Sequence, residues 1–265
     1  MKIGIGITTT SSRFEIVENS LKILKSIINE NKNKYEFIVS ISCDGDLKND
    51  ELNTWNDLKL KFQNFIFNFK NNQSIAKNKN LSLEPLKENN CDFYLMLDDD
   101  CYINDIKGIE YYIEACKDFH FLHLHLTGWL RNRNDHDPRL IKKYDNFSVF
   151  KYNYPNGCFI IFDKMVLEKT NGWNDEFIGW GFEHGEFERR TGKLLKLNEI
   201  YLAIPEVYEN NYIISYDAHF NNNCKKSYNE LKNVQKLNKS KIEYERSSCY
   251  DHNKMVNDKS MSLFD

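Results

Sequence analysis

Apolar residues in the first part of the chain follow two different spacings. Four short apolar runs have the length of buried strands, and they lie at residues 3–7, 36–42, 65–69 and 93–97. Between these runs, apolar residues recur at the spacing of one helix face. The helices that this spacing predicts cover residues 14–29, 49–61 and 75–86, with Ser12 as the N-terminal cap of the first. Strands that alternate with helices are typical of an open α/β sheet whose strands run mainly parallel.

The second half of the chain carries weaker signals of the same kind. A helix is predicted at 106–116, and further strands are predicted at 119–126, 147–152 and 157–162. Beyond Phe220 the composition shifts to lysine and asparagine, with apolar residues at helical spacing, so a peripheral helix followed by a loose tail is expected there. The predicted organisation is one domain over residues 1–220, with halves at 1–105 and 106–220, and a helical C-terminal extension and tail over 221–265.

Bulk properties narrow the classes of function. With 265 residues, 41% of them hydrophobic, the chain can bury a substantial core, and its formal net charge of −3 makes no electrostatic case for binding nucleic acid. The seven cysteines are scattered, without a Cys-x-x-Cys pair, so reduced thiols are expected rather than a disulfide framework or a zinc site. The apolar start of the chain is too short for a signal peptide, and no apolar run is long enough to span a membrane. These features predict a cytoplasmic protein.

Polar residues gather where three of the predicted strands end. The first strand runs into a turn with Thr8 and Arg13, the second ends at Asp44, and the fourth ends at the triplet Asp98-Asp99-Asp100. Ligands of parallel α/β sheets bind at the carboxyl ends of the strands, so these residues are expected to share one site. Carboxylates so close together repel one another unless a cation lies among them. An Asp-x-Asp pair can hold Mg²⁺ or Mn²⁺ while the ion also binds phosphates, although a solvated acidic turn is the simpler alternative.

The segment from Asn171 to Arg190 is the most distinctive part of the sequence. It contains Asn171-Gly172-Trp173, then Trp180-Gly181-Phe182-Glu183-His184-Gly185-Glu186, then Arg190. This order closely resembles a C-terminal module of GT-A glycosyltransferases, in particular the β-1,4-galactosyltransferases, the polypeptide N-acetylgalactosaminyltransferases and the chondroitin-polymerase type of bacterial enzyme. The resemblance covers roughly residues 2–220 and implies the GT-A form of the α/β fold, a central, mainly parallel sheet flanked by helices.

The resemblance also implies roles for individual residues. The nucleotide-binding residues that it implies are Thr8, Arg13, Asp44, Asp98 and Asp99, and the implied ligands of Mn²⁺ or Mg²⁺ are Asp98, Asp100 and His219. The implied contacts to donor and acceptor sugars are Trp180, Gly181 and Glu186. His219 follows the Trp-Gly pair at the spacing of a further metal ligand in relatives, but a packed or surface histidine is the alternative.

Position 184 departs from the pattern of the family. Inverting relatives carry an aspartate there as the general base, whereas this chain has His184. An imidazole, whose ordinary pKa is about 6.5, can take a proton from an acceptor hydroxyl at neutral pH. Glu183 is the second predicted catalytic residue, and it lies one helical turn from Glu186 if a helix begins there. The stereochemical outcome stays open, as does the alternative that His184 only hydrogen-bonds to the acceptor or to neighbouring acids.

Further side chains receive weaker predictions. Arg189 and Arg190 are expected to form ion pairs with nearby acids, and His123 and His125 to face an acceptor wall from one side of a strand. The loop from Arg131 to Arg139 is expected to be a mobile acceptor or lid loop. Whether the lysine-rich extension docks on a membrane surface or mediates a dimer stays open, and the oligomeric state is not predicted.

The resulting hypothesis is a metal-dependent glycosyltransferase of the hexosyl- or N-acetylhexosaminyltransferase class. It would move a sugar from a nucleotide-sugar donor, a UDP-sugar, to a hydroxyl of a glycan or glycoconjugate. The alternatives are a sugar nucleotidyltransferase and a catalytically inactive protein that binds nucleotide sugars or carbohydrates. The glycine-rich run with a basic residue that a nucleotidyltransferase needs is missing after Ile7.

Overall fold

The computed structural model describes residues 1–45, 47–71, 74–124, 138–153, 157–177 and 183–215. In the first half, the strands are β1 (Lys2–Thr10), β2 (Glu36–Asp44), β3 (Ile66–Phe69), β4 (Phe93–Asp98) and β5 (Cys101–Ile103). The helices there are the 3-10 turn η1 (Ser11–Arg13), α1 (Phe14–Asn31), α2 (Asn49–Lys61), α3 (Ile75–Glu88) and α4 (Ile106–Phe119).

The second half adds short strands and helices. Its strands are β6 (Phe121–His123), β7 (Arg139–Lys143), β8 (Ser148–Lys151), β9 (Phe159–Asp163), β10 (Leu202–Ala203) and β11 (Ile213–Ser215). Its helices are α5 (Lys164–Thr170), α6 (Glu183–Leu195) and α7 (Pro205–Glu209).

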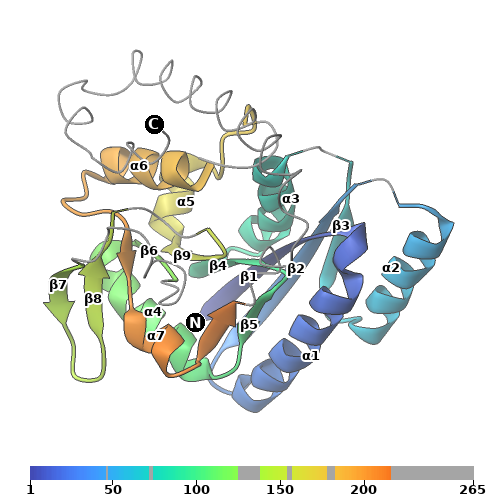
Figure 1. Cartoon of the computed structure of the whole chain (residues 1–265), viewed down its shortest axis with the longest axis horizontal. Helices are drawn as coiled ribbons and strands as arrows, with labels where there is room; N and C mark the ends of the chain where they lie inside the picture. Colours follow the sequence, from blue (N-terminus) through green and yellow to red (C-terminus); the bar gives the residue numbers. More distant parts are fainter. Residues whose placement is uncertain (46, 72–73, 125–137, 154–156, 178–182, 216–265) are drawn as a thin grey trace, which may run out of the picture.

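A large mixed sheet organises the described part of the chain. Its strand order is β3-β2-β1-β4-β9-β6-β10-β8-β7, and β5 pairs with β11 in a separate two-stranded ladder. The strands β3, β2, β1 and β4 run parallel, and β9 inserts antiparallel between β4 and β6. Figure 1 shows the sheet between two helical layers, with α1, α4 and α7 below it and α3, α5 and α6 above it. The predicted mainly parallel α/β sheet flanked by helices is confirmed.

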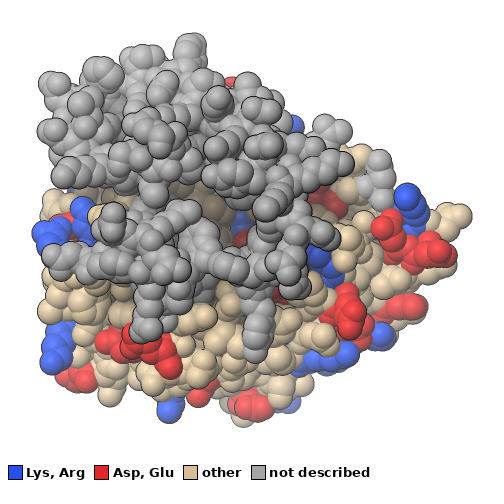
Figure 2. All heavy atoms as spheres, viewed as in Figure 1, with Lys and Arg blue, Asp and Glu red and all other residues tan. Residues whose placement is uncertain are grey.

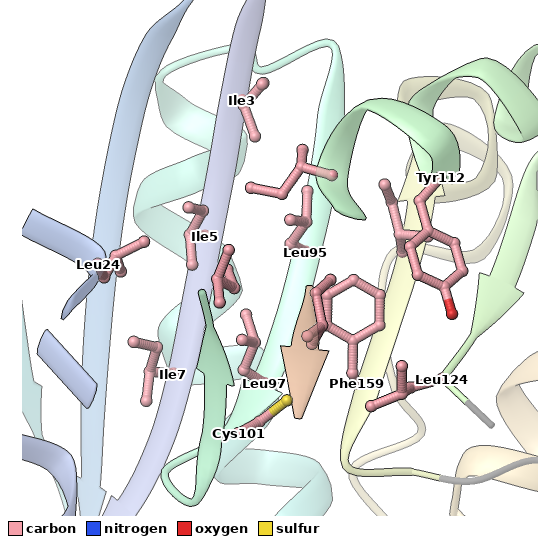
Figure 3. Close-up of a cluster of buried hydrophobic side chains, with 14 of the residues drawn as sticks. Ile3, Ile5, Ile7, Leu24, Leu95, Leu97, Cys101, Tyr112, Leu124 and Phe159 are labelled. Carbon is pink, nitrogen blue, oxygen red and sulfur yellow. The ribbon is translucent and has the colours of Figure 1, made fainter. Parts of the chain in front are cut away.

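Each face of the sheet carries its own hydrophobic core, and β1 shows how the sequence divides them. Its isoleucines Ile3, Ile5 and Ile7 lie in the core between the sheet and helices α1 and α4, with Leu95 and Leu97 of β4 beside them (Figure 3). The residues of β4 that alternate with these, including Tyr94 and Met96, lie in the other core with α3, α5 and α6. Successive side chains of a strand point to opposite faces, so a continuous apolar run fills both cores.

The glycines of β1 bring α3 close to the sheet. A Cβ at Gly4 would lie 3.2 Å from Leu86 Cβ, and one at Gly6 would lie 3.1 Å from Ser82 Oγ and 2.5 Å from the methyl group of Met96. The Ile-Gly-Ile-Gly-Ile pattern therefore puts bulk on the α1 face and leaves room for α3 on the other. This close packing positions the first residues of α3 at the carboxyl edge of the sheet.

The predicted helices and strands of the first half are confirmed with small shifts at their ends, and the second half needed corrections. The cap prediction for Ser12 is wrong, because α1 begins after Arg13 without a side-chain cap. The predicted strand at 119–126 is shorter in the structure, since His120 takes a left-handed backbone angle, φ 65°, and ends α4. Arg139, predicted in the lid loop, opens strand β7; residues 125–137 lie outside the described ranges.

The described residues also bear on the predictions from composition. Cys43, Cys91, Cys101, Cys116 and Cys158 are free thiols, as expected. None of the helices in the described ranges has both the length and the hydropathy needed to cross a bilayer. In the face shown in Figure 2, acidic and basic side chains alternate along the described surface, which agrees with the balanced charge of the chain.

Candidate functional site

The carboxyl ends of β1, β2 and β4 bring the predicted donor-side residues together. In the parallel ladders, Thr8 of β1 is the register partner of Asp98, and Thr10 is the register partner of Asp44. The hydroxyl of Thr8 lies 3.5 Å from Asp98 Oδ1. The register therefore places the two acids on either side of the β1 terminus, as expected for residues at the carboxyl ends of parallel strands.

The central acid of the triplet is a structural anchor for Arg13. Asp99 is 3% exposed, accepts a hydrogen bond from Thr9 Oγ1 at 2.6 Å and accepts two from Arg13 Nε at 2.8 and 2.9 Å. Burial raises the pKa of Asp99 to about 6, although Arg13 and Thr9 act in the opposite direction. Asp99 thus holds the guanidinium at the sheet edge and has little surface left for a ligand.

Arg13 joins the second and third acids of the triplet. Its Nη2 lies 2.6 Å from Asp99 Oδ1 and 2.8 Å from Asp100 Oδ2. Burial acts to lower the pKa of Arg13, but the two carboxylates outweigh it and the pKa is raised. Asp100 Oδ1 lies 3.5 Å from the hydroxyl of Ser215, the last residue of β11, so the β5–β11 ladder brings a late segment of the chain to the triplet.

Lys79 pairs with the first acid of the triplet, a contact that the sequence reasoning missed. Its ammonium donates to Asp98 Oδ1 at 2.7 Å, and its side chain is 0% exposed whereas that of Asp98 is 31% exposed. Burial acts to raise the pKa of Asp98, but Lys79, with His184 and Arg13, lowers it below its ordinary value. Lys79 lies on α3, close to Ser74, whose side chain caps that helix. A lysine between polar residues of a helix gives no sequence signal of burial.

The first turn of α6 carries a buried carboxylate in contact with a partly buried imidazole. His184 Nε2 lies 3.1 Å from Glu183 Oε1, and Glu183 is 3% exposed. Burial acts to raise the pKa of Glu183, but His184 and Lys79 lower it, so the carboxylate is the stable form. Within the described residues α6 begins at Glu183, so the condition for placing Glu183 one turn before Glu186 is met.

Two observations place this turn at the same edge as the triplet. Asp98 N–H donates to the carbonyl of Cys158 at 2.9 Å, and the neighbouring Gly157 supports the ring of His184 so closely that a Cβ there would lie 2.1 Å from Cδ2. Charge connects them as well, since His184 lowers the pKa of Asp98 and Lys79 lowers that of Glu183. The triplet and the first turn of α6 therefore border one site.

Arg190 and Glu186 hold the preceding turn against α6. Arg190 Nε donates to Glu186 Oε1 at 2.6 Å, and its other nitrogens donate to the carbonyls of Thr170 and Gly172, both at 2.8 Å. The ion pair predicted for Arg190 is confirmed. Glu186 therefore pairs with Arg190, whereas Glu183, one helical turn earlier, contacts His184.

The Asn171-Gly172-Trp173 turn is also attached to α3. Gly172 has φ +102°, which a residue with a side chain rarely adopts, and a Cβ there would lie 2.5 Å from Asn80 Oδ1. Asn80 donates to the carbonyl of Trp173 and accepts from its N–H, both at 2.8 Å. The ring of Trp173 then meets that of His184 edge to face at 6.3 Å between centroids. The motif is thus a support for the α6 turn.

Some predicted site residues lie elsewhere or outside the described ranges. Asp44 ends β2 and is partly exposed, next to the β1 terminus. Trp180, Gly181 and His219 lie outside the described residues. Within the described ranges, His, Cys, Asp and Glu form no group of three or more that could hold a metal ion.

Comparisons with known proteins identify the fold. No family model matches the chain, and no curated protein matches it in sequence. Among solved structures, the mannosyltransferase PcManGT of Pyrobaculum calidifontis, in complex with GDP-Man and Mn²⁺, aligns over 77% of this chain at 10% identity and a TM-score of 0.53. TarS 1–349 of S. aureus aligns over 78% of this chain at 16% identity and a TM-score of 0.53. GalNAc-T7 with UDP, GalNAc and Mn²⁺ aligns over 77% of this chain at 12% identity and a TM-score of 0.55.

These likenesses show the fold of the chain. It is a GT-A glycosyltransferase-like fold, as the sequence motifs implied. The chain covers 55%, 61% and 42% of the lengths of those three structures, so it spans roughly half of each.

Proposed function

We propose that this chain is a metal-dependent glycosyltransferase that moves a sugar from a nucleotide-sugar donor, a UDP-sugar, to a hydroxyl of a glycan or glycoconjugate. The observation that carries the proposal is the shared site of the acidic triplet and the α6 turn, in which Lys79 acts on both Asp98 and Glu183. One edge of the site is rich in acids and cations, and the other holds a base beside a carboxylate. Transfer of a group from a diphosphate to a hydroxyl needs charged groups at the diphosphate and a base at the hydroxyl.

The nucleotide would lie on the donor side of this site. Thr8 lies near the end of β1 and Asp44 lies beside that end, where the base and ribose would meet hydrogen-bonding groups. Asp98, 31% exposed beside Lys79, can accept hydrogen bonds from ribose hydroxyls. Arg13 would face the phosphates while Asp99 holds it in place, so Asp99 acts through Arg13.

The donor set fits Mn²⁺ or Mg²⁺ with further ligands from the diphosphate. Asp98 and Asp100 offer the carboxylate oxygens that such ions prefer. His219 would be a third ligand. Ser215 lies beside Asp100 and precedes His219 by four residues, and because four residues of chain span at most about 14 Å, His219 would stay within that distance of Ser215. An ion held there by Asp98 and Asp100 would neutralise the charge that develops on the leaving diphosphate.

His184 would act as the general base. The contact with Glu183 implies that His184 Nε2 carries the proton and that Nδ1 has the lone pair. Nδ1 is buried and has no hydrogen-bond partner among the described residues. As the acceptor oxygen bonds to the anomeric carbon and the bond to the diphosphate breaks, Nδ1 takes the hydroxyl proton, and Glu183 stabilises the imidazolium. Glu186, paired with Arg190, would position the turn, and Trp180 and Gly181 would contact the sugars.

Donor turnover tests the proposal directly. The full chain is mixed with UDP-, GDP- and other common nucleotide sugars in the presence of Mn²⁺, Mg²⁺ or a chelator, and nucleotide release and thermal stabilisation are measured. We expect one donor to be turned over in a metal-dependent manner and to stabilise the protein. If the protein binds a nucleotide sugar but turns over none of the donors with any acceptor, a nucleotide-sugar-binding protein is favoured. Neither binding nor turnover would refute the proposal.

A further inference from the structure

Two cysteines adjoin the candidate site and lie against each other. Cys101 opens β5 directly after the acidic triplet, and Cys158 stands between Gly157 and the first residue of β9. The thiols of Cys101 and Cys158 share a hydrogen bond. The backbone explains their approach, because Asp98 N–H donates to the carbonyl of Cys158 at 2.9 Å, and β5 begins three residues after Asp98. The fold thus brings together two sulfurs from segments far apart in the sequence.

The two thiols differ in their access to solvent. Cys101 is 1% exposed and lies in the same core as Leu97 and Phe159 (Figure 3). Cys158 packs against this core but is only partly buried. A dissolved oxidant therefore reaches Cys158 first and finds a second thiol directly beside it. An accessible cysteine next to a resolving cysteine is the usual arrangement of a redox-sensing pair.

The other cysteines in the described ranges have no such neighbour. Cys43, Cys91 and Cys116 are each 0% exposed, and no hydrogen bond joins any of them to a second thiol among the described residues. Cys43 Sγ donates to the carbonyl of Asp44 at 3.8 Å instead. Buried single thiols of this kind are inert, so the pair at the site is the one with the arrangement for redox chemistry in this part of the chain.

We propose that Cys101 and Cys158 are a dithiol that a peroxide oxidises to a disulfide, and that this bond reversibly lowers the activity of the candidate site. In the first step the Cys158 sulfur attacks the peroxide and the O–O bond breaks. One oxygen stays on the sulfur as a sulfenic acid, and the other leaves with the thiol proton as water or an alcohol. In the second step the Cys101 sulfur attacks the sulfur of Cys158, and the hydroxyl leaves as water with the Cys101 proton. The peroxide has then accepted the two electrons that the thiols lost.

The disulfide would act on both sides of the site. An S–S bond is about 2.05 Å long, which is shorter than the contact of two hydrogen-bonded thiols, so at least one backbone segment must move when it forms. Cys101 is the chain neighbour of Asp100, and Cys158 is the chain neighbour of Gly157, which supports the ring of His184. A close-packed interior passes such a displacement on to its neighbours. The effect on transfer rests on the proposed glycosyltransferase function, whereas formation of the disulfide does not.

Oxidation of the full chain tests the pair. Reduced, dilute protein is treated with hydrogen peroxide, the remaining thiols are alkylated, and tryptic peptides are analysed by mass spectrometry with and without dithiothreitol. We expect peptides 88–107 and 152–164 to be joined, and fragmentation to assign the bond to Cys101 and not to Cys91 of the same peptide. Transfer should fall by about a hundredfold, the cost of a misplacement of about 1 Å in an active site, and recover with dithiothreitol.

Matched variants assign the effect to the two thiols. In C158A both the joined peptides and the loss of transfer on oxidation should be absent. In C101A the sulfenic acid of Cys158 has no thiol beside it, so it should accumulate and be trapped by dimedone. C116A, at an equally buried thiol of α4, is the control and should respond to peroxide as the wild type does. If C101A does not fold, the joined peptides of the wild type decide the question.

Two results would overturn the inference. One is folded wild-type protein in which peroxide produces no bond between Cys101 and Cys158, and the other is joined protein that transfers sugar as fast as the reduced form. Failure of the proposed function is recognised separately, because the reduced protein would then turn over no nucleotide sugar while the two peptides would still be joined.

Discussion

The ammonium of Lys79 donates a hydrogen bond to Asp98 Oδ1 over 2.7 Å from a position with no solvent exposure. This contact links α3 to the end of β4 and puts a fixed positive charge behind the first acid of the triplet. The same charge lowers the pKa of Glu183 on α6, so one buried lysine acts on both sides of the candidate site. Three segments far apart in the sequence thereby share one electrostatic environment.

Replacing Lys79 by methionine should destabilise the protein and weaken donor binding. The change leaves Asp98 without its cation, and loss of one partner of a buried pair costs about 3–5 kcal/mol, with the lower end expected here because Asp98 is 31% exposed. Urea unfolding measures the loss. The double variant K79M/D98N should recover part of the stability but none of the nucleotide binding. A K79M protein as stable as the wild type would show that the pair has no such role.

Replacing Gly157 by alanine should impair transfer more than stability. The added Cβ would lie 2.1 Å from the ring of His184, so the imidazole must turn away from Glu183. A drop in kcat/KM of about a hundredfold is expected, since small misplacements of a catalytic group cost that much. The matched control is G185A, where the Cβ makes only ordinary contact, 3.4 Å from Arg189. Equal activity in the two variants would contradict the supporting role of Gly157.

Replacing His184 by asparagine should separate chemistry from donor binding. Asparagine can keep a hydrogen bond to Glu183 but cannot take the acceptor proton, so transfer should fall by about 10² to 10⁴. Affinity for UDP, measured by calorimetry, should stay close to that of the wild type. Transfer by E183Q should fall less, because the amide that replaces the carboxylate can still orient the imidazole but no longer carries the charge that stabilises it. Transfer at the wild-type rate in H184N would remove His184 from the catalytic role.

Stability should depend on pH through Glu188. Its pKa is raised from 4.5 to about 8 in the folded state, so the folded protein holds a proton that the unfolded chain releases above pH 4.5. This group therefore lowers the free energy of unfolding as pH rises from about 4.5 to 8, and adds no further change above that. The free energy of unfolding therefore falls by at most about 1.4 kcal/mol for each pH unit.

The E188Q variant removes this dependence. Its melting temperature should exceed that of the wild type by a margin that grows between pH 5 and pH 8 and then levels off. E168Q, at an exposed glutamate 3.8 Å from Lys164, serves as the control and should track the wild type. A constant difference between E188Q and the wild type across this range would contradict the raised pKa.

The elements of the first half could be predicted from sequence because their signals are local. The apolar run Phe93–Leu97 and the helical spacing of α1 report burial by themselves, and Asp44 and the triplet follow strands whose parallel order fixes where they meet. The second half was harder, because short strands such as β10 and β11 are defined by their partners. Their formation depends on ladders with residues distant in the chain, which leave no period in the sequence.

Local patterns in the amino-acid sequence are enough to predict the α/β alternation, the polar edge of the sheet and the motif that resembles GT-A transferases. Which charged side chains meet depends instead on how the helices pack on the sheet. Arg189 and Arg190 are neighbours with the same chemistry, yet Arg190 faces Glu186 and the Gly172 turn whereas Arg189 turns toward Gly185 and Tyr201. Likewise, Lys77 is exposed and Lys79 is buried against Asp98. The physical reason is that the partner of a long charged side chain is set by the packing of whole helices against the sheet, which no local pattern records.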